Sequence, residues 1–348
     1  MQDRNNEMRQ KKYTKQFILL LIILGVLGFV NISFGSVTIP FKDIFAILLG
    51  DESIKDSWQT IILNFRLPKA ITAILVGSGL SISGLLMQTL FRNPLAGPFV
   101  LGISSGASLG VALLILGSSF FGGFIFLEYS NWSIAIASSL GSFLVLSAVI
   151  LAAKKVRNTM SILIIGLMFG SFTAAIISVL SYFSEAQQIQ QYVFWSFGSL
   201  GNLSWDELSI FISIFIIGFA GVFIVIKPLN SFLLGEKYAK SLGVNVKQSR
   251  IIILVITSLL TGVITAFSGP IAFIGLAVPH IAKLIFTTSN HKILIPATAI
   301  TGAIVLLICD IIAQLPSIAY TLPINAITSL FGAPVVIWLL IRKKKLYI

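Results

Sequence analysis

The sequence predicts an all-α integral membrane protein with about ten transmembrane helices. Residues of the AVILMFWYC set make up 56% of the 348 positions, and charged residues make up only 10%. An ordinary globular protein has roughly 25% charged residues, whereas the mean hydropathy here is +0.99. So few charges could not cover a soluble surface. This composition excludes a soluble enzyme, a disordered chain and a coiled coil.

Ten apolar runs are the third observation behind this prediction. A helix needs about 20 mostly apolar residues to cross a hydrocarbon layer of ~30 Å. Suitable runs cover residues 17–34, 68–90, 98–117, 132–153, 160–182, 207–226, 249–267, 271–286, 293–314 and 322–341. The turn Ser268-Gly269-Pro270 is so short that its two flanking runs could also form one broken helix. The first run lacks a convincing cleavage site, so we expect an uncleaved helix rather than a signal peptide.

The distribution of charge predicts the orientation. The chain has 24 Lys and Arg against 12 Asp and Glu, a net charge of +12. With a cytoplasmic N-terminus and ten crossings, all of the basic residues except Lys42, Lys55, Arg66 and Lys69 lie on the inner side, as the positive-inside rule requires. We therefore expect one permease domain over residues 1–348, cytoplasmic tails at 1–16 and 342–348, and a cytoplasmic loop at 227–250. Basic clusters between apolar runs indicate a membrane surface as partner, not nucleic acid.

Several kinds of chemistry have no support in the sequence. No Gly-Lys pair exists, so there is no Walker A loop to bind ATP. The single cysteine, Cys309, cannot build a disulfide framework or a Cys/His metal site. His280 has no second ligand at helical spacing, so we expect it to be a packing or inner-surface residue rather than a metal ligand. No His/Asp/Glu cluster supports a membrane-embedded enzyme, and we expect neither a metal nor a cofactor.

Asp310 is the main ionisable residue in the predicted membrane core. It could be the proton relay of an ion-coupled secondary transporter, which is the alternative function from another class. It could also be a structural residue, partly hydrated near the outer end of its helix. We favour the structural interpretation, because one acid is thin evidence for a carrier.

Small residues recur at helical spacing. Gly102, Gly106 and Gly110 lie on one face of the third predicted helix. The second helix contains Gly77, Gly79, Ser81, Ser83 and Gly84. Such residues allow helix backbones to approach closely in lipid. We expect them to build a tightly packed scaffold.

Three segments are more specific than hydropathy. The first combines Arg66-Leu67-Pro68-Lys69, the small-residue stretch 77–84 and Arg92-Asn93-Pro94-Leu95-Ala96-Gly97-Pro98. The second is Leu229-Asn230 followed by the stretch from Gly235 to Val244. The third runs from Gly269 to Ile281, with Gly332-Ala333-Pro334 near the end. In order and spacing, these segments resemble the FecCD family of ABC-importer permeases. That family imports ferric siderophores, haem and cobalamin.

The resemblance implies a type II ABC importer permease fold with inverted repeats, in a bacterial inner membrane. It implies a second permease copy as partner, forming a homodimer or pairing with a close paralogue, and two cytoplasmic ABC ATPase subunits. An extracytoplasmic binding protein would deliver the cargo. The chain itself would not be an enzyme, because ATP hydrolysis would take place on the separate subunits. Ferric siderophore is the first expectation for the cargo, with haem or cobalamin as alternatives.

The loop at 227–250 is the longest polar, inward-facing segment. We expect a short helix around Glu236 to Leu242, bracketed by Gly235 and Gly243. Its residues alone allow either a helix that fits a partner's groove or a solvated basic loop near anionic lipid. The pattern of Glu236, Ala239 and Gly243 resembles the family's coupling motif. The resemblance therefore assigns ATPase coupling to Gly235, Glu236, Ala239, Leu242 and Gly243.

Basic residues at the outer end of the second helix form a second candidate site. The resemblance implies that Arg66 and Lys69 receive carboxylates of the binding protein, while anchoring to lipid headgroups is the alternative. The chain departs from the family at Lys69, where arginine is common, and at Gln314, where a basic residue is common. Asn325 also departs from the family, which tends to have glycine there.

Two further segments are candidates for the transport pathway. Arg92, Asn93 and Pro94 form the inner turn between the second and third helices, and could shape a cytoplasmic gate or only cap and reverse the chain. The fifth helix, Met160 to Tyr182, and the loop to Trp205 are candidates for the pathway wall. That loop contains four glutamines, Gln187, Gln188, Gln190 and Gln191.

Overall fold

A computed structural model describes residues 2–51, 53–117, 130–156, 159–314 and 321–341. Within these residues the regular elements are helical. The order of elements is α1 (Gln2–Ser33), α2 (Phe41–Leu48), α3 (Asp56–Thr60), η1 (Ile61–Arg66), α4 (Leu67–Phe91), η2 (Pro98–Leu101), α5 (Ile103–Ile115), α6 (Asn131–Lys155), α7 (Thr159–Tyr182), α8 (Ala186–Ser196), α9 (Trp205–Phe232), α10 (Glu236–Ser241), α11 (Val246–Ser268), α12 (Ile274–Phe286), α13 (His291–Gln314) and α14 (Ile324–Ile341).

Each of the ten predicted crossings corresponds to a helix or a continuous helical segment. In the described residues, seven helical segments are long and apolar enough to cross a membrane. Three shorter apolar helices, α5, α12 and α14, account for the remaining runs. Gly269 at the short turn has a φ of 71°, and it separates α11 from α12, so the two runs are distinct helices.

Three boundaries differ from the sequence-based expectation. The predicted loop at 227–250 is shorter, because α9 continues to Phe232 and α11 already begins at Val246. Helix α1 begins at Gln2, so the described part of the predicted tail at 1–16 is helical and continues into the membrane-spanning segment. The predicted tail at 342–348 lies outside the described residues. The second crossing begins at Asp56, not near Pro68, because a π-helical turn, η1, joins α3 to α4. Proline lacks an N–H and disrupts regular α-helical bonding, and the wider turn lies directly before Pro68.

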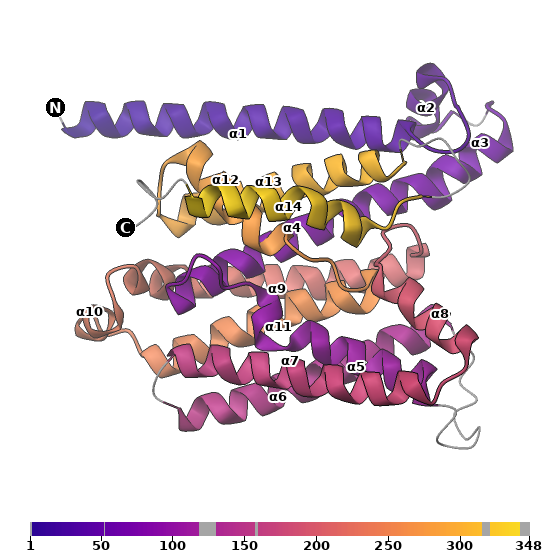
Figure 1. The fold of residues 1–348 in the computed structure, drawn as a ribbon. Coiled ribbons are helices and arrows are strands. Elements are labelled where there is room, and N and C mark those ends of the chain that lie inside the picture. Colours follow the sequence, from indigo (N-terminus) through magenta and orange to yellow (C-terminus); the bar gives the residue numbers. More distant parts are fainter. Residues whose placement is uncertain (1, 52, 118–129, 157–158, 315–320, 342–348) are drawn as a thin grey trace.

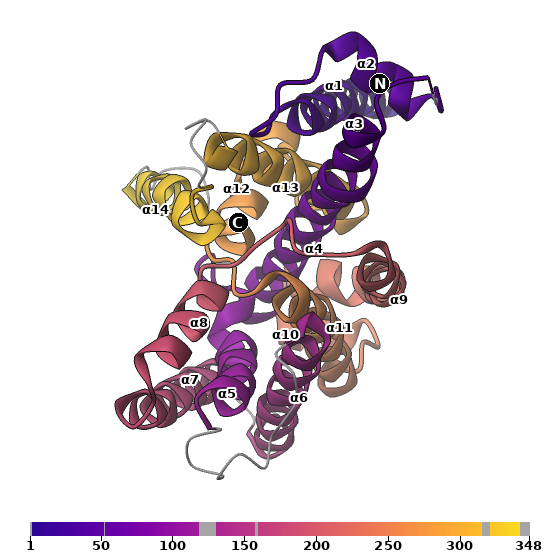
Figure 2. The ribbon, with the colours of Figure 1, turned by 90° about the vertical axis from the view of Figure 1, so that its right-hand side faces the viewer.

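The long helices run roughly along one axis (Figure 1). The start of α1, the end of α14 and α10 lie at one end of the bundle, and α2, α3 and α8 lie at the opposite end. These ends are called the inner and the outer end, after the orientation that the charge distribution predicts. Viewed along the bundle, α4 passes between the group containing α12, α13 and α14 and the group containing α5, α6 and α7 (Figure 2). Helix α4 packs against α13, α11, α12 and α9.

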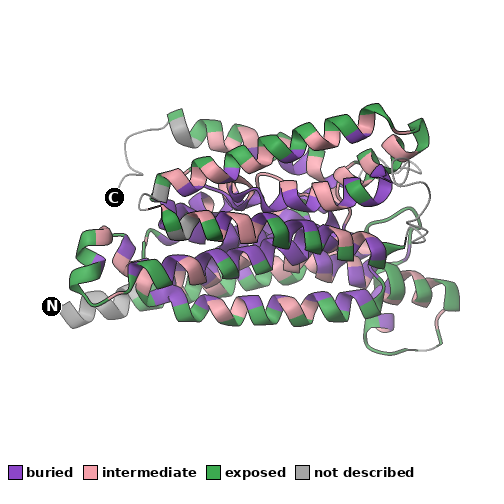
Figure 3. Ribbon diagram, turned by 90° about the horizontal axis from the view of Figure 1, so that it is seen from below, coloured by how far each residue is buried: buried purple, intermediate pink, exposed green. Residues whose placement is uncertain are grey.

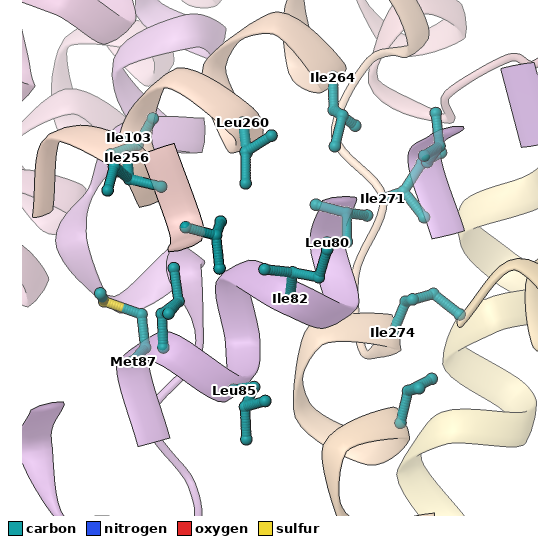
Figure 4. Close-up of a cluster of buried hydrophobic side chains, with 14 of the residues drawn as sticks. Leu80, Ile82, Leu85, Met87, Ile103, Ile256, Leu260, Ile264, Ile271 and Ile274 are labelled. Atoms are coloured by element: carbon teal, nitrogen blue, oxygen red, sulfur yellow. The ribbon is translucent and has the colours of Figure 1, made fainter. Parts of the chain in front are cut away.

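Burial follows this arrangement. The interior of the bundle is buried, and the outer faces of the peripheral helices are exposed (Figure 3). Most of α4 and α11 is buried, whereas α1 and α7 are largely exposed and apolar. In the core, Leu80 and Leu85 of α4 lie among side chains of α11 and α12, including Leu260, Ile264 and Ile274 (Figure 4). A helix with apolar residues on all sides suits this central position.

The predicted close packing at small residues is confirmed. A Cβ atom at Gly84 of α4 would overlap the carbonyl oxygen of Gly275 in α12, and one at Gly110 of α5 would overlap that of Ala137 in α6. Side chains larger than hydrogen would therefore push these helix pairs apart.

Candidate coupling and docking sites

The predicted short helix in the loop at 227–250 exists as α10, within one residue of the expected bounds. Gly235, with a φ of 104°, turns the chain out of α9 and into α10. Glu236 pairs with Arg250 of α11, with 3.0 Å between Oε1 and Nη2. Ala239 is fully buried and belongs to the main hydrophobic core. These contacts attach α10 to the ends of α9 and α11.

The rest of α10 and its flanks display apolar side chains. Leu234, Tyr238 and Leu242 have exposed fractions of 64%, 51% and 56%. They lie at the inner end, where α10 projects beyond the neighbouring helices (Figure 1). A cluster of exposed apolar residues outside the membrane-spanning segments is typical of a protein interaction site.

The inner turn between α4 and η2 lies close to α10. Arg92 has a φ of 49° and ends α4 in the left-handed conformation. Its guanidinium lies beside Gly235, where a Cβ atom would be 3.5 Å from Arg92 Nη1. Pro94 presents its carbonyl oxygen to His280 Nε2 at 2.9 Å. The fold therefore brings together the two segments that sequence reasoning treated as separate candidates.

Asn93 also has a local role in this turn. Its side-chain Oδ1 accepts a hydrogen bond from the backbone N–H of Leu95 at 2.9 Å. The turn is thus capped internally, which is the simpler of the two predicted roles. A gating role for Arg92, Asn93 and Pro94 stays a prediction.

A junction of three helices near α10 was missed by sequence reasoning. His291, the first residue of α13, is 1% exposed and contacts Asn230 of α9 and Thr89 of α4. The sequence provides only a weak signal, a histidine beside the polar stretch Thr287 to Asn290. Its partners could not be found from spacing, because they lie 61 and 202 positions away.

Arg66 does not project from the outer end of its helix. It is 8% exposed, and its guanidinium donates hydrogen bonds to the carbonyl oxygens of Ile32 and Ser33, both at 3.0 Å, and of Val37. The side chain thereby joins the π-helical turn to the end of α1 and to the connection toward α2. The last carbonyl groups of a helix have no hydrogen-bond partner within the helix. The guanidinium of Arg66 supplies partners for two of these groups at the end of α1.

Lys69 also has an internal partner. Its Nζ atom lies 3.0 Å from Oδ1 of Asp310, whose side chain is only 4% exposed. The other carboxylate oxygen of Asp310 accepts hydrogen bonds from Asn31 at 2.8 Å and Gln314 at 2.7 Å. Asp310 is buried and paired rather than partly hydrated, and these contacts favour the structural interpretation. The docking roles of Arg66 and Lys69 stay predictions, and both cations are already engaged within the chain.

The structure also gives Asn325 and His280 their contacts. The side-chain Oδ1 of Asn325 accepts a hydrogen bond from the backbone N–H of Ala272 at 3.1 Å. The backbone N–H of Asn325 donates to the carbonyl oxygen of Phe197 at 3.2 Å. Asn325 thus connects the start of α14 with the α11–α12 turn and the end of α8. His280 is a buried packing residue, and among the described residues no group of three or more His, Cys, Asp or Glu residues lies together.

The proposed pathway wall is a largely apolar surface. Helix α7 exposes Leu167, Met168 and Phe172 along one side. Of the four glutamines, Gln188 accepts a hydrogen bond from the N–H of Glu185 in the cap of α8, and Gln191 lines a cavity of 360 Å³ between α5, α6, α8 and α11. Helices α7 and α14 border the same side of the molecule in both ribbon views (Figures 1 and 2).

Comparison with known proteins agrees with this architecture. The hemin transport system permease protein HmuU of Yersinia pestis is 35% identical over 331 residues, which cover 94% of this chain and 95% of that protein. The vitamin B12 import system permease protein BtuC of Klebsiella pneumoniae is 33% identical over 338 residues, with coverage of 97% and 96%. A solved metal-chelate type ABC transporter in an inward-facing conformation superposes with a TM-score of 0.82 at 28% identity, covering 94% of this chain and 99% of that one.

The fold is therefore that of an ABC-transporter permease, a class of multi-span membrane proteins. The sequence profile of the FecCD transport family matches residues 20–342. The chain belongs to the FecCD transport family.

Proposed function

We propose that this permease is the membrane-spanning half of a binding-protein-dependent importer for a large organic metal chelate. The observation that carries the proposal is the helix α10, a short element held to the core by Ala239 and displaying Leu234, Tyr238 and Leu242 at the inner end. Such a surface suits a groove on a cytoplasmic ATPase subunit. The permease performs no covalent chemistry in this scheme.

The transport pathway is proposed to lie between two copies of the chain. Helices α7 and α14 border the same side of the bundle, and both expose apolar residues, including Phe172 and Phe331. When ATP brings the two ATPase subunits together, α10 is displaced and the helices lining the pathway alternate between outward-open and inward-open arrangements. A wall with few fixed charges suits a bulky cargo that passes without tight binding.

Ferric siderophore remains our first proposal for the cargo. The relatives named as hemin and vitamin B12 permeases, and the neighbour described as a metal-chelate transporter, support a chelated metal as the shared cargo chemistry. The extracytoplasmic binding protein performs most of the selection. Titration of that protein with a ferric siderophore, haem and cobalamin would decide among the three.

The coupling assignment has a direct test in the reconstituted complex. Glu236→Gln removes the charge that pairs with Arg250, and Gly243→Ala strains a residue with a φ of 80°. Both changes should reduce ATP hydrolysis linked to transport. Unchanged coupling in both variants would refute the assignment of this loop.

A further inference from the structure

The junction of His291, Asn230 and Thr89 has no role in the function proposed so far. It lies at the inner end, where α13 begins and α9 and α4 end. His291 is 1% exposed, and Thr89 is 5% exposed. A buried polar group in this position must be hydrogen-bonded, because an unpaired one would be costly.

The hydrogen bonds determine the tautomer of the neutral imidazole. Asn230 Oδ1 accepts from the backbone N–H of His291 at 2.9 Å and lies 2.8 Å from its Nδ1. The amide nitrogen of Asn230 donates to Asn290 Oδ1 at 3.3 Å, which assigns the orientation of the amide. Because an amide oxygen can only accept, Nδ1 carries the proton. In the neutral ring, Nε2 then accepts from the hydroxyl of Thr89 at 2.9 Å.

The three residues connect the base of α10 to the inner turn. Asn230 lies six positions before Glu236, close to the end of α9. Thr89 lies three positions before Arg92, which ends α4. The ring of His291 therefore joins the helix that leads into α10 to the helix that leads into the turn at 92–94.

We infer that His291 is a positioning residue that transmits displacement of α10 to the inner end of α4. This inference rests on the proposed function. Buried hydrogen bonds are directional and shielded from water, so movement of Asn230 changes the position of the ring and, through Nε2, of Thr89. The guanidinium of Arg92 beside Gly235 is a more exposed contact between the same two segments.

The central test compares Thr89→Val with Thr89→Ser in the complex of permease, ATPase and binding protein. Valine keeps the branched shape and removes the hydroxyl, whereas serine keeps the hydroxyl. The control is Thr257→Val, because Thr257 is fully buried in α11 and its hydroxyl has no hydrogen-bond partner in the described part of the chain. The measurement is uptake of radiolabelled ferric siderophore, or of haem or cobalamin if the binding protein retains one of those, per ATP hydrolysed.

Thr89→Val should lower the uptake per ATP about fivefold, the scale of a modest coupling energy. Thr89→Ser and Thr257→Val should keep the wild-type ratio. A wild-type ratio in Thr89→Val, or an equal loss in Thr257→Val, would overturn the inference. If Thr89→Val does not assemble, His291→Phe replaces it, because phenylalanine keeps an aromatic ring but has no ring nitrogen atoms. The same loss of uptake per ATP is then expected for His291→Phe.

A second readout follows movement of the turn itself. Leu95 is 43% exposed, and the single native cysteine, Cys309, is buried, so Leu95→Cys provides an accessible thiol. Its labelling rate should change on nucleotide binding in the parent complex and lose that change when combined with Thr89→Val. If the hydrogen bonds of His291 only stabilise the fold, the labelling rate of the double variant should still depend on nucleotide. If the wild-type complex neither imports cargo nor hydrolyses ATP, the proposed function is refuted. If the wild-type complex is active and Thr89→Val has the wild-type uptake per ATP, only the role of His291 is refuted.

Discussion

Lys69 and Asp310 form an ion pair of 3.0 Å between α4 and α13 at the outer end of the bundle. Asn31 and Gln314 donate hydrogen bonds to the second carboxylate oxygen, so the carboxylate has partners from α1, α4 and its own helix. Partners from three helices indicate that this carboxylate helps to hold α1, α4 and α13 together. The arrangement favours a structural role over the proton relay of a secondary carrier.

Asp310→Asn should destabilise the protein while leaving transport activity in the molecules that remain folded. Removal of one partner from a buried ion pair leaves the other charge uncompensated, at a cost of about 3 kcal/mol. Thermal unfolding in detergent would measure this loss. The double variant Lys69→Met with Asp310→Leu should recover most of it. Complete loss of uptake in a stable, folded Asp310→Asn protein would instead support the proton relay.

The same double variant tests the predicted docking role of Lys69. It removes the cation without leaving Asp310 unpaired, so folding and docking can be separated. If a carboxylate of the binding protein competes with Asp310 for Lys69, the affinity of the double variant should be lower than wild type at low salt and similar at high salt. Titration of the binding protein at two ionic strengths would measure the difference. An identical salt response in both proteins would eliminate Lys69 as a docking residue.

Leu242→Ala should weaken binding of the ATPase subunit and leave the fold intact. Leu242 is 56% exposed on the α10 surface, and truncation of a central interface residue commonly costs about 2 kcal/mol, or roughly 30-fold in affinity. Leu49→Ala is the matched control, because Leu49 is a 73% exposed leucine after α2, at the opposite end of the bundle. Pull-down of the ATPase with each variant would measure the effect. Equal losses for both leucines would contradict a specific site at α10.

Gly84→Ala should destabilise the bundle, because the added methyl group would overlap the backbone of α12 at Gly275. Overpacking against backbone atoms costs about 3 kcal/mol when the helices cannot separate. Gly262→Ala is the control: Gly262 lies in α11 with no neighbouring heavy atom within 4 Å of an added Cβ. Its replacement should be neutral or stabilising by up to about 1 kcal/mol. Comparable melting temperatures for the two variants would show that α4 and α12 do not need this close approach.

The sequence predicts the helices better than the contacts between them. Hydropathy and length place the ten crossings, because transfer of a segment into lipid depends mainly on its own residues. The predicted start of the second crossing was wrong by about three helical turns, since the π-helical turn before Pro68 keeps the chain helical back to Asp56. The helix at Glu236 was predictable because Gly235 and a local change in polarity mark it.

The pattern of apolar runs by itself determined a membrane protein with about ten crossings, and the basic loops predict that the loop near Glu236 faces inward. Only the tertiary structure decided that Arg66 binds carbonyl groups at the end of α1, that Asp310 is paired with Lys69, and that His291 joins α4 to α9. The reason is physical: hydropathy is a local property of the chain, whereas these polar groups find their partners across helices. Asn31 and Asp310, for example, are 279 positions apart, and only the packing of α1 against α13 brings their side chains within 2.8 Å.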